Sequence, residues 1–132
     1  MLYDNLGINE KGHLTIGGMD TVDIASEFGT ALYVMDEDKL RSNIRTYTDA
    51  MNRYLAPGSM PLLASKALCF KGIYPVIDSE CMGADLVSPG EIYTACAAGF
   101  PPEKMYFHGN NKTDEDIRFA LEHKVGWFII DN

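Results

Sequence analysis

The residue whose type and position best suit covalent chemistry is Lys66, in the tripeptide Ser65-Lys66-Ala67 that follows an apolar run at residues 60–64. A lysine at the end of a buried strand is rare unless it is used, because burial disfavours the ammonium form and leaves a better nucleophile toward an aldehyde. Those are the properties of a lysine that forms a Schiff base. The alternative is an ordinary strand end whose lysine extends its amine into water.

Two further polar residues end apolar segments at similar intervals. Asp85 lies in the segment Gly-Ala-Asp-Leu-Val-Ser-Pro-Gly-Glu at 83–91, and His108 lies in Tyr-Phe-His-Gly-Asn-Asn-Lys at 106–112. Each has an ordinary interpretation, a loop-capping carboxylate for Asp85 and a packed, hydrogen-bonded histidine for His108. Lysine, aspartate and histidine at one recurring position are harder to explain as coincidence, so we expect them to form one site.

The elements that must position these residues alternate along the chain. Hydrophobic patterning predicts strands near 60–65, 82–87, 104–107 and 126–130, and helices over 69–79, 89–98 and 113–123, with a strand-to-strand period of about 21 residues. Thr113 and Asp116 fit the first and fourth positions of a capping box. Alternating strands and helices with short loops indicate parallel strands covered by helices.

The first part of the chain is organised differently. Residues 1–19 are rich in glycine and include one short strand candidate, and Asp20 is placed to cap a helix that ends at Gly29. A strand is expected over 31–35, and then a long helix from Asp36 to the Pro57-Gly58 pair. An apolar stripe along that helix is expected to be core; it comprises Leu40, Ile44, Tyr47, Met51 and Tyr54.

Two folds fit the alternation, an open doubly wound sheet and a (β/α)8 barrel. No G-x-G-x-x-G motif follows the first strand, which removes the best indication of a dinucleotide-binding sheet. Barrel enzymes carry their active sites at the carboxyl ends of the strands, where the prediction places Lys66, Asp85, His108 and Asp131. A barrel takes about 250 residues, so we expect these 132 residues to be the N-terminal portion of a larger protein. We expect the isolated piece, a half-barrel, to be poorly soluble or to self-associate.

Composition narrows the class of protein. The net charge is −8, from 19 acidic and 11 basic residues, which argues against nucleic acid or an anionic membrane as a partner. Cys69, Cys81 and Cys96 are odd in number and match no zinc signature, so we expect reduced, mostly buried thiols. There is no signal peptide pattern and no apolar run of about 20 residues, which indicates a cytoplasmic protein.

Five blocks in order resemble the fold-type III pyridoxal-phosphate decarboxylases, and most closely their diaminopimelate group. They are Phe-Gly-Thr-Ala-Leu-Tyr-Val-Met-Asp-Glu-Asp at 28–38, Ala-Ser-Lys-Ala at 64–67, the segment 83–93, Ala-Gly-Phe-Pro-Pro-Glu-Lys at 98–104, and Phe-His-Gly-Asn-Asn-Lys at 107–112. Two positions depart from the usual pattern: Ser65 stands where many relatives have leucine, and Pro89 replaces a glycine. Proline suits the first turn of a helix, so the loop should keep its form.

The resemblance implies a pyridoxal 5'-phosphate enzyme with Lys66 as the Schiff-base lysine and Ala64, Asp85 and His108 beside the cofactor. It implies decarboxylation of meso-2,6-diaminopimelate to L-lysine by a homodimer, with the phosphate loop, the ring-stacking histidine and a partner-subunit cysteine outside this chain. Arginine, ornithine or carboxynorspermidine as substrate, or a non-catalytic partner-binding relative, remain alternatives. Residues 1–30 are expected to pack with a C-terminal β domain, and 31–132 to begin the barrel, which by itself should be inactive.

Overall fold

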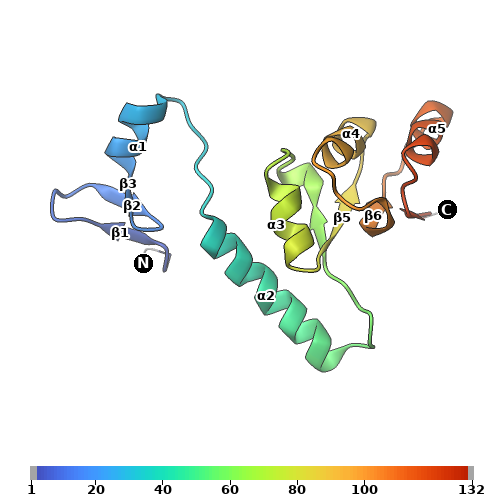
Figure 1. Ribbon diagram of the computed structural model, residues 1–132, viewed down its shortest axis with the longest axis horizontal. Helices are drawn as coiled ribbons and strands as arrows, with labels where there is room; N and C mark the ends of the chain where they lie inside the picture. Colours follow the sequence, from blue (N-terminus) through green and yellow to red (C-terminus); the bar gives the residue numbers. More distant parts are fainter. Residues whose placement is uncertain (1–2, 131–132) are drawn as a thin grey trace. The chain divides into compact units, whose positions relative to one another are not determined.

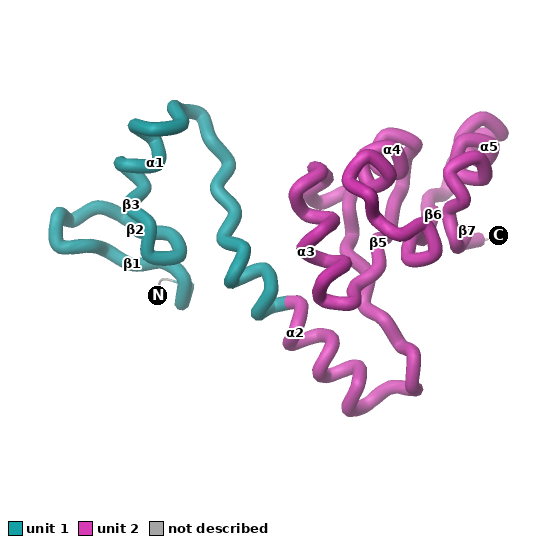
Figure 2. Tube along the Cα trace, viewed as in Figure 1, with its two compact units in different colours: residues 1–43 teal, residues 44–132 magenta. Residues whose placement is uncertain are grey.

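The computed structural model describes residues 3–130. Contacts divide the chain into two compact units, residues 1–43 and 44–132, and each is described by itself (Figure 2). Asp131, one of the predicted strand-end residues, lies outside the described residues. No helix within residues 3–130 is both long enough and apolar enough to cross a membrane.

The first unit contains a small antiparallel sheet and one short helix (Figure 1). The sheet has the order β1 (Leu6–Ile8), β2 (Leu14–Ile16) and β3 (Met19–Asp20), and helix α1 (Thr21–Phe28) follows directly. The predicted strand near 13–16 and the predicted helix are therefore confirmed. Gly29 ends α1 with φ of 84°, a left-handed value that glycine adopts without strain.

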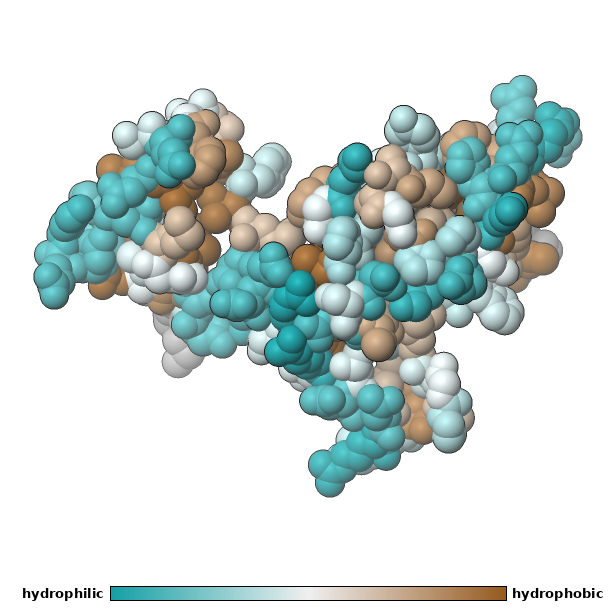
Figure 3. Space-filling model, in the orientation of Figure 1, coloured by the Kyte–Doolittle hydropathy of each residue, from teal (hydrophilic) through white to brown (hydrophobic). Residues whose placement is uncertain are grey.

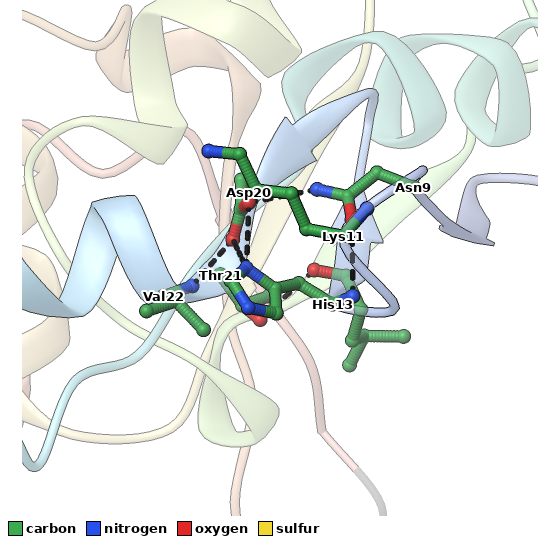
Figure 4. Close-up of polar contacts among 7 residues, drawn as sticks. Asn9, Lys11, His13, Asp20, Thr21 and Val22 are labelled. Carbon is green, nitrogen blue, oxygen red and sulfur yellow. Dashed lines mark hydrogen bonds and ion pairs between the residues drawn. The ribbon is translucent and has the colours of Figure 1, made fainter.

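Asp20 joins the hairpin to α1 through a cluster of hydrogen bonds (Figure 4). Its carboxylate accepts from the backbone N–H of Val22 at 2.9 Å and from the Asn9 side chain at 2.7 Å, and it lies 2.9 Å from Nδ1 of His13. Burial raises the pKa of Asp20, but the hydrogen bonds from His13, Val22 and Asn9 outweigh it and lower the pKa to about 2. The predicted N-cap is thus confirmed, and Asp20 also ties the start of the helix to the hairpin.

Two predictions for residues 31–54 are wrong. Residues 31–35 form an exposed extended segment and not a strand, because no neighbouring strand among the described residues supplies hydrogen-bond partners. Helix α2 (Glu37–Tyr54) forms as predicted, yet on its apolar stripe only Ile44 is buried, while Tyr47 and Tyr54 are 64% and 72% exposed. An apolar stripe is buried only where another element covers it, and the surface over α2 is largely hydrophilic (Figure 3).

The second unit is a four-stranded parallel sheet in the order β4-β5-β6-β7, with a helix after each of the first three strands (Figure 1). Its elements are β4 (Leu62–Ala64), η1 (Ser65–Ala67), α3 (Ile73–Ser79), β5 (Gly83–Leu86), α4 (Pro89–Ala97), η2 (Pro102–Lys104), β6 (Met105–Phe107), α5 (Asp114–Glu122) and β7 (Trp127–Phe128). All four predicted strands and all three predicted helices are confirmed, with ends shifted by a few residues.

The register of this sheet is level across all four strands. Ala64 pairs with Asp85, Asp85 with Tyr106, and Tyr106 with Trp127, so residues 21 apart in the sequence form one row. Side chains of neighbouring residues in a strand point to opposite faces. The row therefore lies on one face, and residues one position before or after it lie on the other.

The face opposite the row forms the core. Ala84, Leu86, Met105 and Phe107 are at most 1% exposed, and the helices contribute buried residues that include Ile77, Ile92 and Ala120. Burying one large apolar side chain stabilises the fold by about 1.5–3 kcal/mol. The row face is less covered, since Asp85 and Tyr106 are half-buried and Trp127 is 55% exposed. The functional side chains are thus held on the open face by a core on the other.

Two helices begin with the caps that the sequence predicts. Thr113 and Asp116 form the reciprocal capping box of α5, each side chain accepting from the backbone N–H of the other residue. Pro89 lies in the first turn of α4, where its missing N–H costs no hydrogen bond. Both helix starts are therefore fixed by local chemistry.

Candidate functional site

Lys66 lies on the turn that follows strand β4. The strand ends at Ala64, and the chain closes the short helix η1 with a hydrogen bond from the Leu68 N–H to the Ser65 carbonyl at 3.1 Å. Ser65 is 1% exposed, whereas Lys66 is exposed and makes no hydrogen bond or ion pair with residues 3–130. The predicted burial of this lysine is wrong, because in so tight a turn consecutive side chains point in different directions.

Asp85 and His108 come together at the ends of the next two strands. Asp85 is the third residue of β5, and His108 directly follows β6, where its N–H extends the ladder by donating to the Leu86 carbonyl at 2.8 Å. Nδ1 of His108 is 3.6 Å from Oδ1 of Asp85, which is an ion-pair distance and too long for a direct hydrogen bond. The predicted meeting of these two residues is confirmed.

The site is only partly assembled by contacts within the described chain. Strand pairing places Ala64 beside Asp85, and so brings the β4 end to the β5 end. No contact within residues 3–130 joins Lys66 to Asp85 or His108. The structure thus places three of the four predicted site residues together and puts the amine of the fourth in solvent, two positions beyond Ala64.

The loop between β5 and α4 is held by its own polar groups. The Val87 N–H donates to Oε2 of Glu91 at 2.8 Å, and the Glu91 N–H donates to Oγ of Ser88 at 3.3 Å. These bonds satisfy N–H groups at the helix start that have no partner within the helix. Glu91 therefore supports the loop beside Asp85.

Sequence reasoning did not single out Lys112. Its Nζ donates to the carbonyl of Gly109 at 2.6 Å and to that of Ile129 at 2.8 Å, and lies 5.7 Å from the centre of the Phe107 ring. Lys112 thereby links the loop after β6 to the end of β7. No sequence signal could have found this, because its hydrogen-bond acceptors are backbone carbonyls that every residue carries.

Lys112 also lines an open groove of about 410 Å³, together with Asn110 and Phe128. On the row face, Tyr106 and Trp127 stack with centroids 5.7 Å apart and planes 7° from parallel. The stack follows from the level register, because residues 21 apart become direct neighbours. The strand ends therefore present a carboxylate, an imidazole, two cations and an aromatic surface.

The described residues also bear on metal binding and on the state of the cysteines. Within residues 3–130 no three His, Cys, Asp or Glu side chains cluster closely enough to hold a metal ion. Cys69, Cys81 and Cys96 are free thiols, but the prediction that most of them are buried is wrong, since Cys69 and Cys96 are half-buried and Cys81 is exposed. What the site offers is a free primary amine at a strand end with acid–base groups on the neighbouring strands.

Comparison with known proteins decides the family. Residues 37–132 match the model of the pyridoxal-dependent decarboxylases, pyridoxal binding domain. The chain belongs to this family. It is 42% identical over 125 residues to diaminopimelate decarboxylase of Bacillus methanolicus, covering 95% of this chain and 29% of that protein. The chain thus spans less than a third of the length of such curated relatives.

Solved structures agree. The crystal structure of diaminopimelate decarboxylase from M. jannaschii in complex with L-lysine matches with a TM-score of 0.80 and 34% identity, over 98% of this chain and 30% of that one. Lysine/ornithine decarboxylase from Vibrio vulnificus, complexed with putrescine, matches with a TM-score of 0.73 and 26% identity, over 85% and 30%. The predicted fold class, the first part of a pyridoxal-phosphate-binding (β/α)8 barrel, is confirmed.

The residues present fit the cofactor that the family binds. Pyridoxal phosphate carries an aldehyde, and Lys66 is an exposed primary amine that no described residue engages. Ala64 adds no bulk beside it, and Asp85 and His108 supply a carboxylate and an imidazole at the ends of the next two strands. An amine with these surroundings is suited to covalent attachment of an aldehyde.

Proposed function

We propose that this chain carries the cofactor-binding lysine of a pyridoxal-phosphate-dependent carboxy-lyase that converts meso-2,6-diaminopimelate to L-lysine and carbon dioxide. The observation that carries the proposal is Lys66, a free amine at the carboxyl end of β4 in a chain of the pyridoxal-binding family. Curated relatives named diaminopimelate decarboxylase, at about 40% identity over most of the chain, support the choice of substrate. The chain covers less than a third of the length of these relatives.

Each residue has a defined task in this proposal. Nζ of Lys66 would hold the cofactor through its aldehyde group, since a primary amine is the side chain that attaches an aldehyde. When bound, the cofactor supplies an electron sink for the electron pair left as carbon dioxide departs. Asp85 and His108 would border the cofactor, with Nδ1 of His108 3.6 Å from Oδ1 of Asp85. Ala64 leaves room for the ring.

The assembly and location of the whole protein are part of the same proposal. We propose a cytoplasmic homodimer, in which residues 1–30 pack with a separate β domain and residues 31–132 contribute to the barrel. Residues 6–28 contain three short strands and one helix, within a compact unit that extends to residue 43. Size-exclusion chromatography with light scattering of the complete gene product tests the dimer.

The test of the proposal begins with the complete product of the gene that encodes this chain. The purified protein is scanned for absorbance with pyridoxal phosphate, reduced with borohydride, digested, and mapped by mass spectrometry. We expect a visible band that borohydride removes and a reduced adduct on Lys66. Release of carbon dioxide is then measured with meso-diaminopimelate, and with lysine, ornithine, arginine and carboxynorspermidine as competing substrates.

Lys66→Ala and Lys71→Ala are a matched pair for this test, since both lysines are exposed and only Lys66 follows a strand end directly. Lys66→Ala should lose the adduct and all turnover, while Lys71→Ala should keep both. No adduct on Lys66 in the unmodified protein would overturn the proposal and favour a non-catalytic relative. An adduct on Lys66 with turnover of ornithine or arginine alone would keep the chemistry and replace the substrate.

A further inference from the structure

A buried polar group lies directly beneath the lysine turn. Apart from the hydroxyl group of Tyr74, Ser65 is the only polar or charged side chain that is buried among the described residues, at 1% exposure, and it immediately precedes Lys66. A buried hydroxyl group without a hydrogen-bond partner costs free energy, so Ser65 needs a partner inside the protein. That partner is Tyr74, from the first turns of α3.

The Tyr74 hydroxyl contacts both sides of the turn. It donates to Oγ of Ser65 at 3.4 Å and lies 3.3 Å from Sγ of Cys69. The hydroxyl has one proton, so when it donates to Ser65 the Cys69 thiol is the donor in the second pair. Tyr74 therefore joins the residue just before Lys66 to the residue three positions after it.

The Tyr74 side chain is itself held in place. It is 0% exposed, and its ring packs against the buried Phe100 with centroids 5.4 Å apart at 55°. Burial, and then the hydrogen bond from Cys69, raise the pKa of Tyr74 above its ordinary value. The phenol thus stays protonated and can donate to Ser65 at any physiological pH.

The geometry connects this contact to the direction of the lysine. In a 3₁₀ turn consecutive residues are about 120° apart around the axis, so fixing one side chain fixes the direction of the next. Ser65 points into the core toward Tyr74, and Lys66 points outward. The Lys66 side chain makes no hydrogen bond or ion pair with residues 3–130, so its orientation depends on the turn that carries it.

We propose that Tyr74 is a positioning residue for Lys66, acting through Ser65 and Cys69 to hold the η1 turn in the orientation that presents the amine to the cofactor. The inference rests on the proposed function of Lys66. It goes further by assigning a role to a phenol and a thiol that touch neither cofactor nor substrate.

The test uses the complete gene product and the variants Tyr74→Phe, Ser65→Ala and their combination. Tyr74→Phe keeps the ring against Phe100 and removes only the hydroxyl. Three readouts are compared: the rate at which added pyridoxal phosphate forms the Lys66 adduct, the visible circular dichroism per bound chromophore, and the share of borohydride adduct that maps to Lys66. The dichroism reports how the bound chromophore is oriented, which a uniform loss of stability does not change.

Because the hydroxyl contacts are long, we expect a modest effect, a two- to fivefold slower attachment (about the value of one weak hydrogen bond), with altered dichroism per bound chromophore. The double variant should match Tyr74→Phe alone, since both changes break the same contact. Tyr93→Phe on α4, whose side chain is 64% exposed, is the matched control and should behave as the unmodified protein.

The outcomes separate the two proposals. If the unmodified protein forms no adduct on Lys66, the proposed function fails and takes the inference with it. If it forms the adduct and Tyr74→Phe shows the same attachment rate and dichroism, the function stands and the positioning role is refuted. A variant with lowered melting temperature but unchanged dichroism per bound chromophore also refutes it, because Tyr74 is then merely part of the core.

Discussion

Lys112 provides the sharpest test of how the strand ends are held together. Its Nζ donates to the carbonyls of Gly109 and Ile129 at 2.6 and 2.8 Å, and these carbonyls belong to the ends of two adjacent βα units. Lys112→Met keeps the length of the side chain and its apolar stem while removing both bonds. The perturbation therefore addresses one link between the units and leaves their helices and strands unchanged.

The magnitude follows from the contacts. A hydrogen bond from a charged donor contributes about 1.5–3 kcal/mol when fully desolvated. Lys112 is half-buried beside an open groove, so water replaces part of each bond when the amine is removed. The contact with the Phe107 ring adds about 0.5–1 kcal/mol. We expect the free energy of unfolding to fall by about 2 kcal/mol, which moves a urea midpoint by about 1 M.

The assay is urea denaturation followed by far-ultraviolet circular dichroism, with hydrogen exchange of the 108–113 peptide as a local readout. Lys71→Met, at an exposed position, is the control for loss of a positive charge. Exchange in the 108–113 peptide should rise in Lys112→Met and remain unchanged in Lys71→Met. If the free energies of unfolding of the two variants agree within about 0.5 kcal/mol, the reasoning is refuted, since surface substitutions commonly change the free energy by no more than that.

Three further predictions concern stability. A methyl group at Gly126 would lie 2.8 Å from Cα of Glu103, so Gly126→Ala should destabilise the folded protein by about 1–3 kcal/mol. Gly90→Ala on α4, where the added methyl group would meet only Oγ of Ser88 at 3.8 Å, should instead stabilise it by up to about 1 kcal/mol in thermal unfolding. Because the pKa of Asp20 is lowered to about 2 from 3.8, its contribution is present above pH 4 and lost as pH falls toward 2; Asp20→Asn should flatten this acid dependence, and an unchanged acid slope would count against the cluster. Thr113→Ala removes the α5 cap and should cost about 1 kcal/mol by urea titration; no loss would mean that Asp116 caps the helix alone.

Sequence patterns predicted the parts of this fold that depend on local rules. The 21-residue rhythm gave the four strands in their order, and hydroxyl and acidic residues at helix starts gave the caps at Asp20 and Thr113. Both signals are short-range, since a cap needs only its own turn and a strand only its alternation. For the same reason the meeting of Asp85 and His108 was predictable once the strands were parallel.

The errors and omissions arise where a side chain's surroundings depend on another segment. The stripe on α2 reads as core, but burial of Tyr47 and Tyr54 requires a covering element that the described residues do not supply. The exposure of Lys66 depends on one backbone turn, in which the Ser65 side chain points into the core and the Lys66 side chain points outward. The acceptors of Lys112 are carbonyls 3 and 17 residues away, which leave no trace in residue types.

Ala64, Asp85, Tyr106 and Trp127 are spaced 21 residues apart and lie in one row across the sheet, and this register constrains how such a chain can change in length. A residue inserted in a helix or in a loop between the strands leaves the register of the strands unchanged. One inserted within a strand turns the rest of that strand over, sending a site residue into the core and a core residue into the site. Length variation among variants of this chain should therefore fall in the helices and loops between the strands, which keeps the strand ends that carry the chemistry in position.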